Sequence, residues 1–123
     1  MEPGRKLRVE KIVEYADTAA SYGSGLLEVF STPAMIALME KSAHLLAKSM
    51  LSDKEDTVGT EIDIKHLRAT PMGASVSAEA ELISAEGRKL VFKVSASDNK
   101  GEIGNGTHIR YIIDPVKFMS KLN

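Results

Sequence analysis

The sequence predicts an α+β fold in which an antiparallel sheet of about five strands wraps around one long central helix. Residues 33–50 form a nearly unbroken apolar run with the period of a helix, and residues 57–114 alternate polar and apolar side chains with the period of strands. Alternating strands joined by short turns form an antiparallel sheet with one wet and one dry face. Because the chain offers no other apolar helix, the helix at 33–50 is expected to cover the dry face.

Chain length and composition exclude several classes of protein. The 123 residues predict a single domain over residues 1–123. Lys and Arg number 16 against 17 Asp and Glu, a balance that predicts neither a nucleic-acid partner nor an anionic membrane as partner. The absence of cysteine excludes disulfides, thiolate zinc sites and a cysteine nucleophile. The N-terminus lacks a secretory signal and no apolar stretch approaches the roughly 18 residues that span a bilayer, so a cytoplasmic protein is expected.

The helix is predicted from its start signals and from its apolar arc. Ser31 or Thr32 can cap its first turn, and Pro33 fits the first helical position. Steps of 100° place Glu40 at the border of the apolar arc, with His44 beside it. The arc itself consists of Met35, Ile36, Met39, Ala43, Leu46, Ala47 and Met50.

Four strands are predicted within residues 57–114, and the N-terminal stretch 5–15 can add one more. Turns are expected at Gly87 and at residues 98–101, and the stretch GEIGNG (101–106) is typical of a bulged strand entry. Alternation in the first of the four strands puts His66 on the inner face, together with Val58, Thr60, Ile62 and Ile64.

Four residues can be read either structurally or chemically. Glu40 is either a border residue that pairs locally, or a carboxylate in a partly apolar pocket that acts as base or nucleophile. Thr32 is a helix cap or a site residue, His66 is a core histidine or a site residue, and Gly59 marks a bulge or a close approach to substrate. Glu40 and His44 lack a third and fourth ligand, so no metal site is predicted.

The predicted order of one strand, one helix and four strands is the outline of a hotdog domain. The stretches STPAMIALMEKSA, TVGTEIDIKHLRATPMG and EIGNGTHIRYII further resemble the hotdog-fold thioesterases of the fluoroacetyl-CoA thioesterase type, over roughly residues 5–120. The resemblance implies hydrolysis of an acyl-CoA thioester, with Thr32, Glu40 and His66 as the catalytic set and Gly59 lining the pocket. It implies no cofactor, because coenzyme A is part of the substrate.

The roles implied by the resemblance leave alternatives open. Glu40 acts as nucleophile through an anhydride or as base on water, Thr32 positions or shares in acyl transfer, and His66 orients water or stabilises charge. A non-catalytic hotdog domain that binds an acyl-CoA or another small ligand is the alternative function. A hydratase is disfavoured because its usual Asp-x-x-x-x-His helix signature is absent.

Substrate contacts and assembly are expected as follows. Gly23 and Leu26 stand where the fluoroacetyl-specific members carry aromatic lid residues, so the acyl preference is not expected to be strictly fluoroacetyl. Basic residues near the pocket are expected to meet the CoA polyanion, and the candidates are Lys65, Arg68 and Arg110. Thr32 and Glu40 are separated by about 12 Å of helical rise, so a homodimer with its site at or near the subunit interface is expected.

Overall fold

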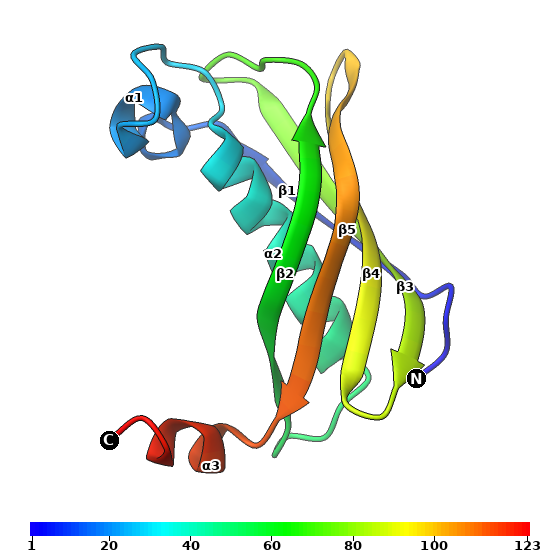
Figure 1. The fold of residues 1–123 in the computed structure, drawn as a ribbon. Coiled ribbons are helices and arrows are strands. Elements are labelled where there is room, and N and C mark those ends of the chain that lie inside the picture. Colours follow the sequence, from blue (N-terminus) through cyan, green and yellow to red (C-terminus); the bar gives the residue numbers. More distant parts are fainter.

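The computed structural model describes residues 1–123 and shows one five-stranded antiparallel sheet curled around a long helix (Figure 1). The strand order is β1-β3-β4-β5-β2, so β1 and β2 form the edges. This architecture confirms the predicted α+β fold and its five strands. The elements are β1 (Lys6–Ile12), the 3-10 turn η1 (Tyr15–Asp17), α1 (Ala19–Tyr22), α2 (Thr32–Lys48), β2 (Asp56–His66), β3 (Ser75–Glu86), β4 (Lys89–Asp98), β5 (Gly101–Ile113) and α3 (Pro115–Ser120).

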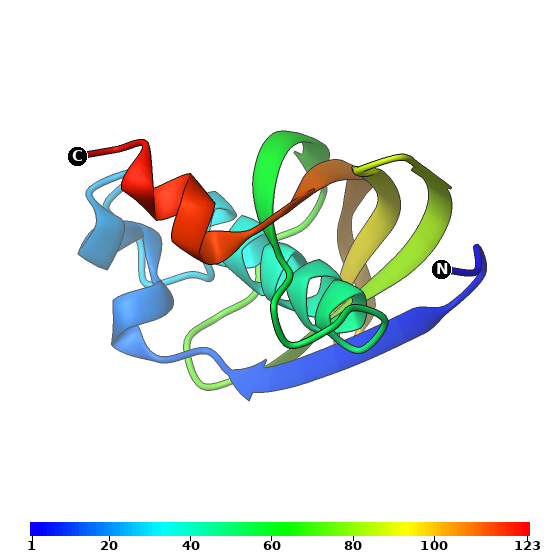
Figure 2. The same ribbon diagram turned by 90° about the horizontal axis from the view of Figure 1, so that it is seen from below.

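Helix α2 begins where its capping signals predict. The Ser31 side chain accepts a hydrogen bond from the backbone N–H of Ala34, and Pro33 lies in the first turn. Its buried side is wider than the predicted arc and includes Leu38 and Ser42. The physical reason is the curl of the sheet, which encloses the helix from more than one side (Figure 2).

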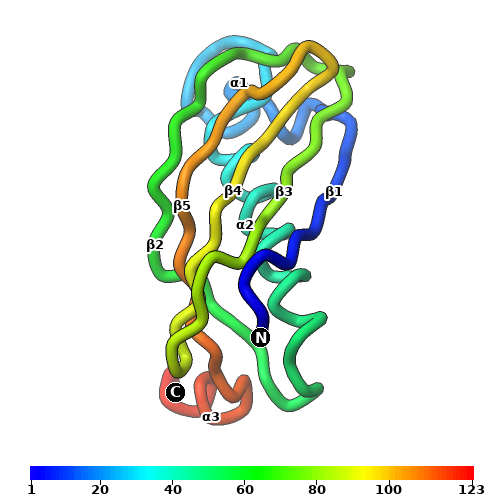
Figure 3. Tube along the Cα trace, turned by 90° about the vertical axis from the view of Figure 1, so that its right-hand side faces the viewer, coloured from blue at the N-terminus to red at the C-terminus, as the bar shows by residue number.

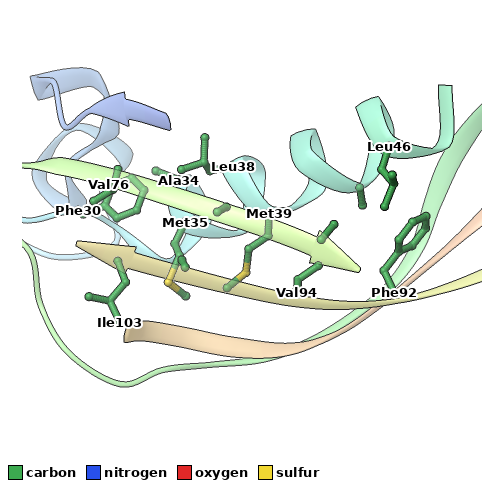
Figure 4. Packing of buried hydrophobic residues seen from close by; sticks show 14 of the residues in the cluster. Phe30, Ala34, Met35, Leu38, Met39, Leu46, Val76, Phe92, Val94 and Ile103 are labelled. Carbon is green, nitrogen blue, oxygen red and sulfur yellow. The ribbon is translucent and has the colours of Figure 1, made fainter. Parts of the chain in front are cut away.

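The core lies between α2 and the concave face of the sheet. It comprises 18 buried apolar residues, and Figure 4 shows Met35, Met39 and Leu46 reaching from the helix toward the strands. Alternate residues of β4, among them Phe92 and Val94, are buried in this core. Each such large side chain contributes roughly 1.5–3 kcal/mol by leaving water, so this layer fixes the position of α2 over the sheet.

Strand β2 departs from the predicted alternation at a bulge. Its register against β5 shifts between Gly59 and Glu61, so Thr60 is an extra residue. The prediction that Val58 and Thr60 share the inner face with His66 is therefore wrong, because one extra residue reverses the alternation. Gly59 takes the inner position instead, opposite Arg110 of β5.

The remaining elements lie at the two ends of the sheet. Helix α1 and its loop lie at one end, and α3 lies at the other (Figures 1 and 3). The predicted turn at Gly87 is present, and its φ of 59° is one that glycine adopts without strain. The predicted bulged entry of β5 is also present, as a register shift beside Ala96. None of the helices combines the length and the apolar character needed to cross a membrane.

Candidate active site

Thr32 and His66 form the first part of the site. The Thr32 Oγ1 atom lies 2.8 Å from His66 Nδ1, which joins the first residue of α2 to the last residue of β2. Burial lowers the pKa of His66, and its Nε2 atom is buried without a hydrogen-bond partner. A neutral imidazole bonded to a hydroxyl can relay a proton to or from that hydroxyl.

A cavity of about 380 Å³ opens beside this pair. Its lining comes from the loop before α2, the start of α2 and the end of β2, and includes Phe30, Thr32, His66 and Leu67. Val29 pairs with Pro71 in an isolated bridge, which ties the loop before α2 to the segment after β2. The Thr32–His66 pair therefore sits in the wall of a concave space, where a small molecule can reach it.

Glu40 belongs to a second group, near the other end of β2. Its Oε2 atom lies 3.9 Å from Arg110 Nη1 and 4.0 Å from His108 Nε2. A Cβ atom at Gly59 would lie 2.9 Å from the same Oε2 atom, so glycine is what leaves room for the carboxylate there. The Glu40 side chain is 41% exposed in the single chain, whereas Arg110 and His108 are buried.

The Arg110 guanidinium donates a hydrogen bond from each of its three nitrogen atoms. Its Nε donates to the Thr57 hydroxyl at 2.8 Å, Nη2 donates to the Thr57 carbonyl at 3.0 Å, and Nη1 donates to His108 Nε2 at 3.2 Å. Burial lowers the pKa of Arg110, and the Glu40 carboxylate opposes this shift. The guanidinium is thereby fixed with one edge toward Glu40.

The hydrogen bonds of His108 define its tautomer. Its Nδ1 lies 2.7 Å from the Glu61 carbonyl, which can only accept, and its Nε2 faces Arg110, which can only donate. His108 therefore carries its proton on Nδ1 and is neutral. Burial lowers the pKa of His108 and the Arg110 charge lowers it further, in agreement with the neutral form.

The two groups lie apart within one chain. Gly59 and His66 are seven residues apart on β2, which is about 20 Å of strand once the bulge is allowed for. The structure brings Thr32 to His66, and Glu40 to Gly59 and Arg110, but it does not bring the three predicted catalytic residues together in one subunit.

Two further residues that were predicted near the substrate, Leu26 and Lys65, do not line the cavity beside Thr32 and His66. Leu26 is 93% exposed and lies outside the cavity lining. Lys65 is exposed. His44 does not pair with Glu40, because its Nε2 lies 2.7 Å from Asp56.

Arg68 is committed to a structural contact. It binds Asp98 through two nitrogens at 2.7 and 3.2 Å, and it also donates to the Gly101 carbonyl. The hydrogen bonds from Arg68 lower the pKa of Asp98 to about 2. This pairing fixes the Arg68 side chain, which also lines the cavity beside Thr32 and His66.

Thr57 and His108 are site residues that the sequence did not indicate. Thr57 lies at the start of the region predicted as strands, and His108 lies in its last strand, where alternation alone assigns no role to either residue. The available signal was Arg110 at an inward position, because a buried guanidinium needs acceptors on the neighbouring strand positions.

Comparison of structures defines the class of protein. The structure of the fluoroacetyl-CoA thioesterase FlK matches with a TM-score of 0.93 and 37% identity, over 99% of this chain and 95% of that chain. A variant of that enzyme solved with acetyl-CoA matches with a TM-score of 0.94 and 36% identity, over 99% and 96% of the two chains. A thioesterase superfamily member from Thermus thermophilus has the same fold, with a TM-score of 0.89 at 23% identity over 98% and 90% of the chains. The protein is thus a hotdog-fold thioesterase.

Sequence comparison defines the family. The profile of the fluoroacetyl-CoA-specific thioesterase family matches residues 13–116. The fluoroacetyl-CoA thioesterase of Streptantibioticus cattleyicolor is 44% identical over 95 residues, which are 77% of this chain and 68% of that protein. The chain therefore belongs to the fluoroacetyl-CoA-specific thioesterase family, which confirms the predicted resemblance.

Proposed function

We propose that this protein hydrolyses acyl-CoA thioesters to the free acid and CoA at a site formed by Thr32, Glu40 and His66. The observation that carries the proposal is the Glu40 carboxylate, which faces a gap left by Gly59 and a fixed guanidinium 3.9 Å away. The relative solved with acetyl-CoA supports an acyl-CoA as the ligand class. Residues 1–123 act as one thioesterase domain in this proposal, in the cytoplasm and without a cofactor.

The chemistry requires one water molecule for each thioester. A C–O bond forms at the carbonyl carbon, the C–S bond breaks, and the CoA thiolate leaves and takes up a proton. Glu40 either removes a proton from the attacking water or attacks the carbonyl itself and forms an anhydride that water then opens. In both routes the positive charge of Arg110 stabilises the negative charge that develops near the reacting carbon. The Thr32–His66 pair transfers a proton.

We also propose that the site is completed by a second copy of the chain. Each subunit holds Thr32 with His66 and, about 20 Å along β2, Glu40 with Gly59. Strand β2 is an edge of the sheet, so its outer backbone groups are free to pair with another strand. Antiparallel pairing of two β2 strands would bring the Thr32–His66 pair of one subunit to the Glu40 group of the other.

The bulge sets the register of this pairing. With the two-fold axis at Asp63, Ile62 faces Ile64 of the partner subunit and Glu61 faces Lys65 of the partner subunit. Without the bulge Gly59 would face Leu67 of the partner subunit, whereas the extra residue Thr60 brings it opposite His66 of the partner subunit. The outer face then carries Glu61–Lys65 pairs of opposite charge on both sides of the axis, and these lysines flank and offset the two Asp63 carboxylates that meet at the axis itself.

The acyl preference is proposed to be wider than fluoroacetyl, with short-chain or aryl acyl groups accepted. Leu26 is almost fully exposed, and Gly23 has a φ of 77° that a side chain would adopt only with strain. Fluoroacetyl-specific members carry aromatic lid side chains at these two positions. In this chain Gly23 and Leu26 stand there, and neither covers the cavity.

The test is release of free thiol from acetyl-CoA, fluoroacetyl-CoA, longer linear and aryl thioesters, with the wild type and Glu40→Gln. We expect the variant to lose activity by about 100-fold or more, because the amide can act neither as base nor as nucleophile. Glu86→Gln is the matched control, since Glu86 is exposed at the β3–β4 turn. Binding of acyl-CoA without thiol release from any thioester would contradict the proposal and favour the acyl-binding domain.

A further inference from the structure

Strand β5 leads into α3 at the end of the sheet opposite α1 (Figure 1). A second cavity, of about 480 Å³, is lined by residues of this region. Four basic residues line it, against the two carboxylates of Glu55 and Asp114. The basic residues come from three separate segments of the chain: the loop before β2, the β3–β4 turn and α3. They are Lys54, Arg88, Lys117 and Lys121.

The protein neutralises the positive charges of this cavity only in part. None of the ion pairs in the structure involves any of the four basic residues. The Glu55 carboxylate accepts hydrogen bonds from Ser52, and the Asp114 carboxylate caps α3 by accepting from the Lys117 backbone N–H. The cavity thus gathers an excess of two positive charges in a chain whose net charge is -1. Such a local field attracts a polyanion.

The basic cavity lies within reach of the Glu40 group. Ile112 lines the cavity and pairs with Thr57, the residue that holds Arg110. From Arg110 to Asp114 the chain runs four residues, or about 13 Å of extended backbone. In an acyl-CoA, the pantetheine arm separates the thioester sulfur from the phosphates by a chain long enough to cross this distance.

We propose that the basic cavity binds the phosphate groups of the CoA moiety, with Lys117 and Lys121 of α3 as its main contacts. This proposal rests on the proposed function and adds to it a subsite for the nucleotide. Phe118, which is partly exposed in the same lining, offers an aromatic face on which the adenine can stack. Lysines suit this role because their compact charges meet phosphates without a fixed geometry.

The experiment compares acetyl-CoA with acetyl-pantetheine, which carries the same thioester and no phosphate. The variant is Lys117→Glu with Lys121→Glu. Both residues are exposed, Lys117 in α3 and Lys121 directly after it, so the two substitutions leave the core undisturbed. The matched control is Lys93→Glu with Lys100→Glu, which makes the same change of charge on β4 and in the β4–β5 turn. The KM and kcat values are measured for both substrates at low and high salt.

We expect the variant to raise KM for acetyl-CoA by about tenfold, with kcat and the KM for acetyl-pantetheine unchanged. The wild-type KM for acetyl-CoA is expected to rise with salt, and that of the control variant to follow the wild type. An unchanged KM for acetyl-CoA, or an equal rise for both substrates, would overturn the subsite.

Failure of the proposed function gives a different result, because the wild type would then hydrolyse neither thioester. In that case calorimetry with adenosine 3′,5′-bisphosphate still tests the cavity directly. Equal binding by the wild type and the Lys117→Glu, Lys121→Glu variant, or no binding by the wild type, would overturn it.

Discussion

At the residue scale, His108 links the backbone of β2 to Arg110, the residue that faces Glu40. It donates to the Glu61 carbonyl beside the bulge and accepts from Arg110, which faces Glu40. Loss of the Nε2 acceptor would leave a buried guanidinium N–H without a partner, which costs about 1–3 kcal/mol. His108 is thus a positioning residue for Arg110.

We therefore predict that His108→Asn lowers kcat/KM by about tenfold, since asparagine can keep the bond to Glu61 but cannot reach Arg110. Steady-state kinetics with an acyl-CoA measures the effect. His44→Asn is the control, because His44 is bonded to Asp56 and lies outside this group. Equal losses in both variants would contradict a specific role for His108.

The same residues predict how stability depends on pH. Burial lowers the pKa of both His66 and His108 below the value of about 6.5 that they have in an unfolded chain. Below pH 6.5 the unfolded chain binds protons that the folded chain does not, so the free energy of unfolding is full above about pH 6.5 and falls on acidification toward the lowered pKa values. Urea unfolding between pH 8 and pH 5 measures this slope, and the variant His66→Asn, His108→Asn is expected to flatten it.

The sequence indicates these residues only in part. Thr32, Glu40 and His66 could be selected because a resemblance covers them, and Arg110 because of its place in the last motif. His108 could not, since its role depends on a carbonyl of another strand and on the side chain two residues away. Arg68 looked free for a ligand, because no sequence signal links it to Asp98, 30 residues later.

At the element scale, Gly106 of β5 and Gly59 of β2 each lie where a Cβ atom would come too close to neighbouring atoms. A Cβ atom at Gly106 would overlap the Asp63 carbonyl and the Ile64 backbone. One at Gly59 would meet side chains only, with the Glu40 carboxylate at 2.9 Å, the His108 ring at 3.1 Å and the Arg110 guanidinium at 3.3 Å. The first glycine therefore serves the pairing of the two strands, and the second serves the site.

We predict that Gly106→Ala lowers the free energy of unfolding by about 2–3 kcal/mol, because the β2 backbone must shift away. Gly59→Ala is predicted to lower the midpoint of thermal unfolding less than Gly106→Ala does, because side chains rather than backbone must give way, and to lower kcat/KM by about tenfold or more. Thermal unfolding and kinetics of both variants measure the two effects. The same loss of stability in both would show that Gly59 also serves packing.

The elements themselves could be predicted because their periods are distinct, but the bulge could not. Any window from Val58 to His66 fits simple alternation, and the phase change at Thr60 follows only from pairing with β5. The wider buried side of α2 was missed for a similar reason, since Leu38 and Ser42 are covered only by the curl of the sheet.

At the scale of the whole molecule, the proposed site between two subunits predicts how mixed dimers behave. A heterodimer of Glu40→Gln and His66→Ala subunits holds one intact site, made of His66 from the first subunit and Glu40 from the second. We predict about half the wild-type activity for this heterodimer, although each variant alone is inactive. Purification through two different tags and a thiol-release assay measure it.

A heterodimer of Glu40→Gln with the double variant Glu40→Gln, His66→Ala is the control, because neither of its sites holds a Glu40. If the first heterodimer is as inactive as its parents, the site lies within one subunit and the pairing of β2 strands is contradicted.

The sequence predicts this assembly only indirectly. The fold follows from counting apolar faces, because one dry sheet face and one apolar helix leave a single arrangement. The separation of Thr32 from Glu40 along α2 predicts a second subunit, but the proposed approach of His66 to the Glu40 group of another copy depends on the register of an edge strand, which no local pattern records.

The segment from Ser21 to Glu28 is exposed throughout and joins the fold mainly through backbone hydrogen bonds, such as those of Ala20 with Leu27 and of Met72 with Glu28. Gly23 is an exception within this segment, because its φ of 77° would strain any other residue. Leu26 and Leu27 are mostly exposed, so substitutions of these side chains cost little folding energy. Under the proposed function, selectivity for the acyl group can therefore change by substitution in this segment without loss of the core that holds Thr32, Glu40 and His66.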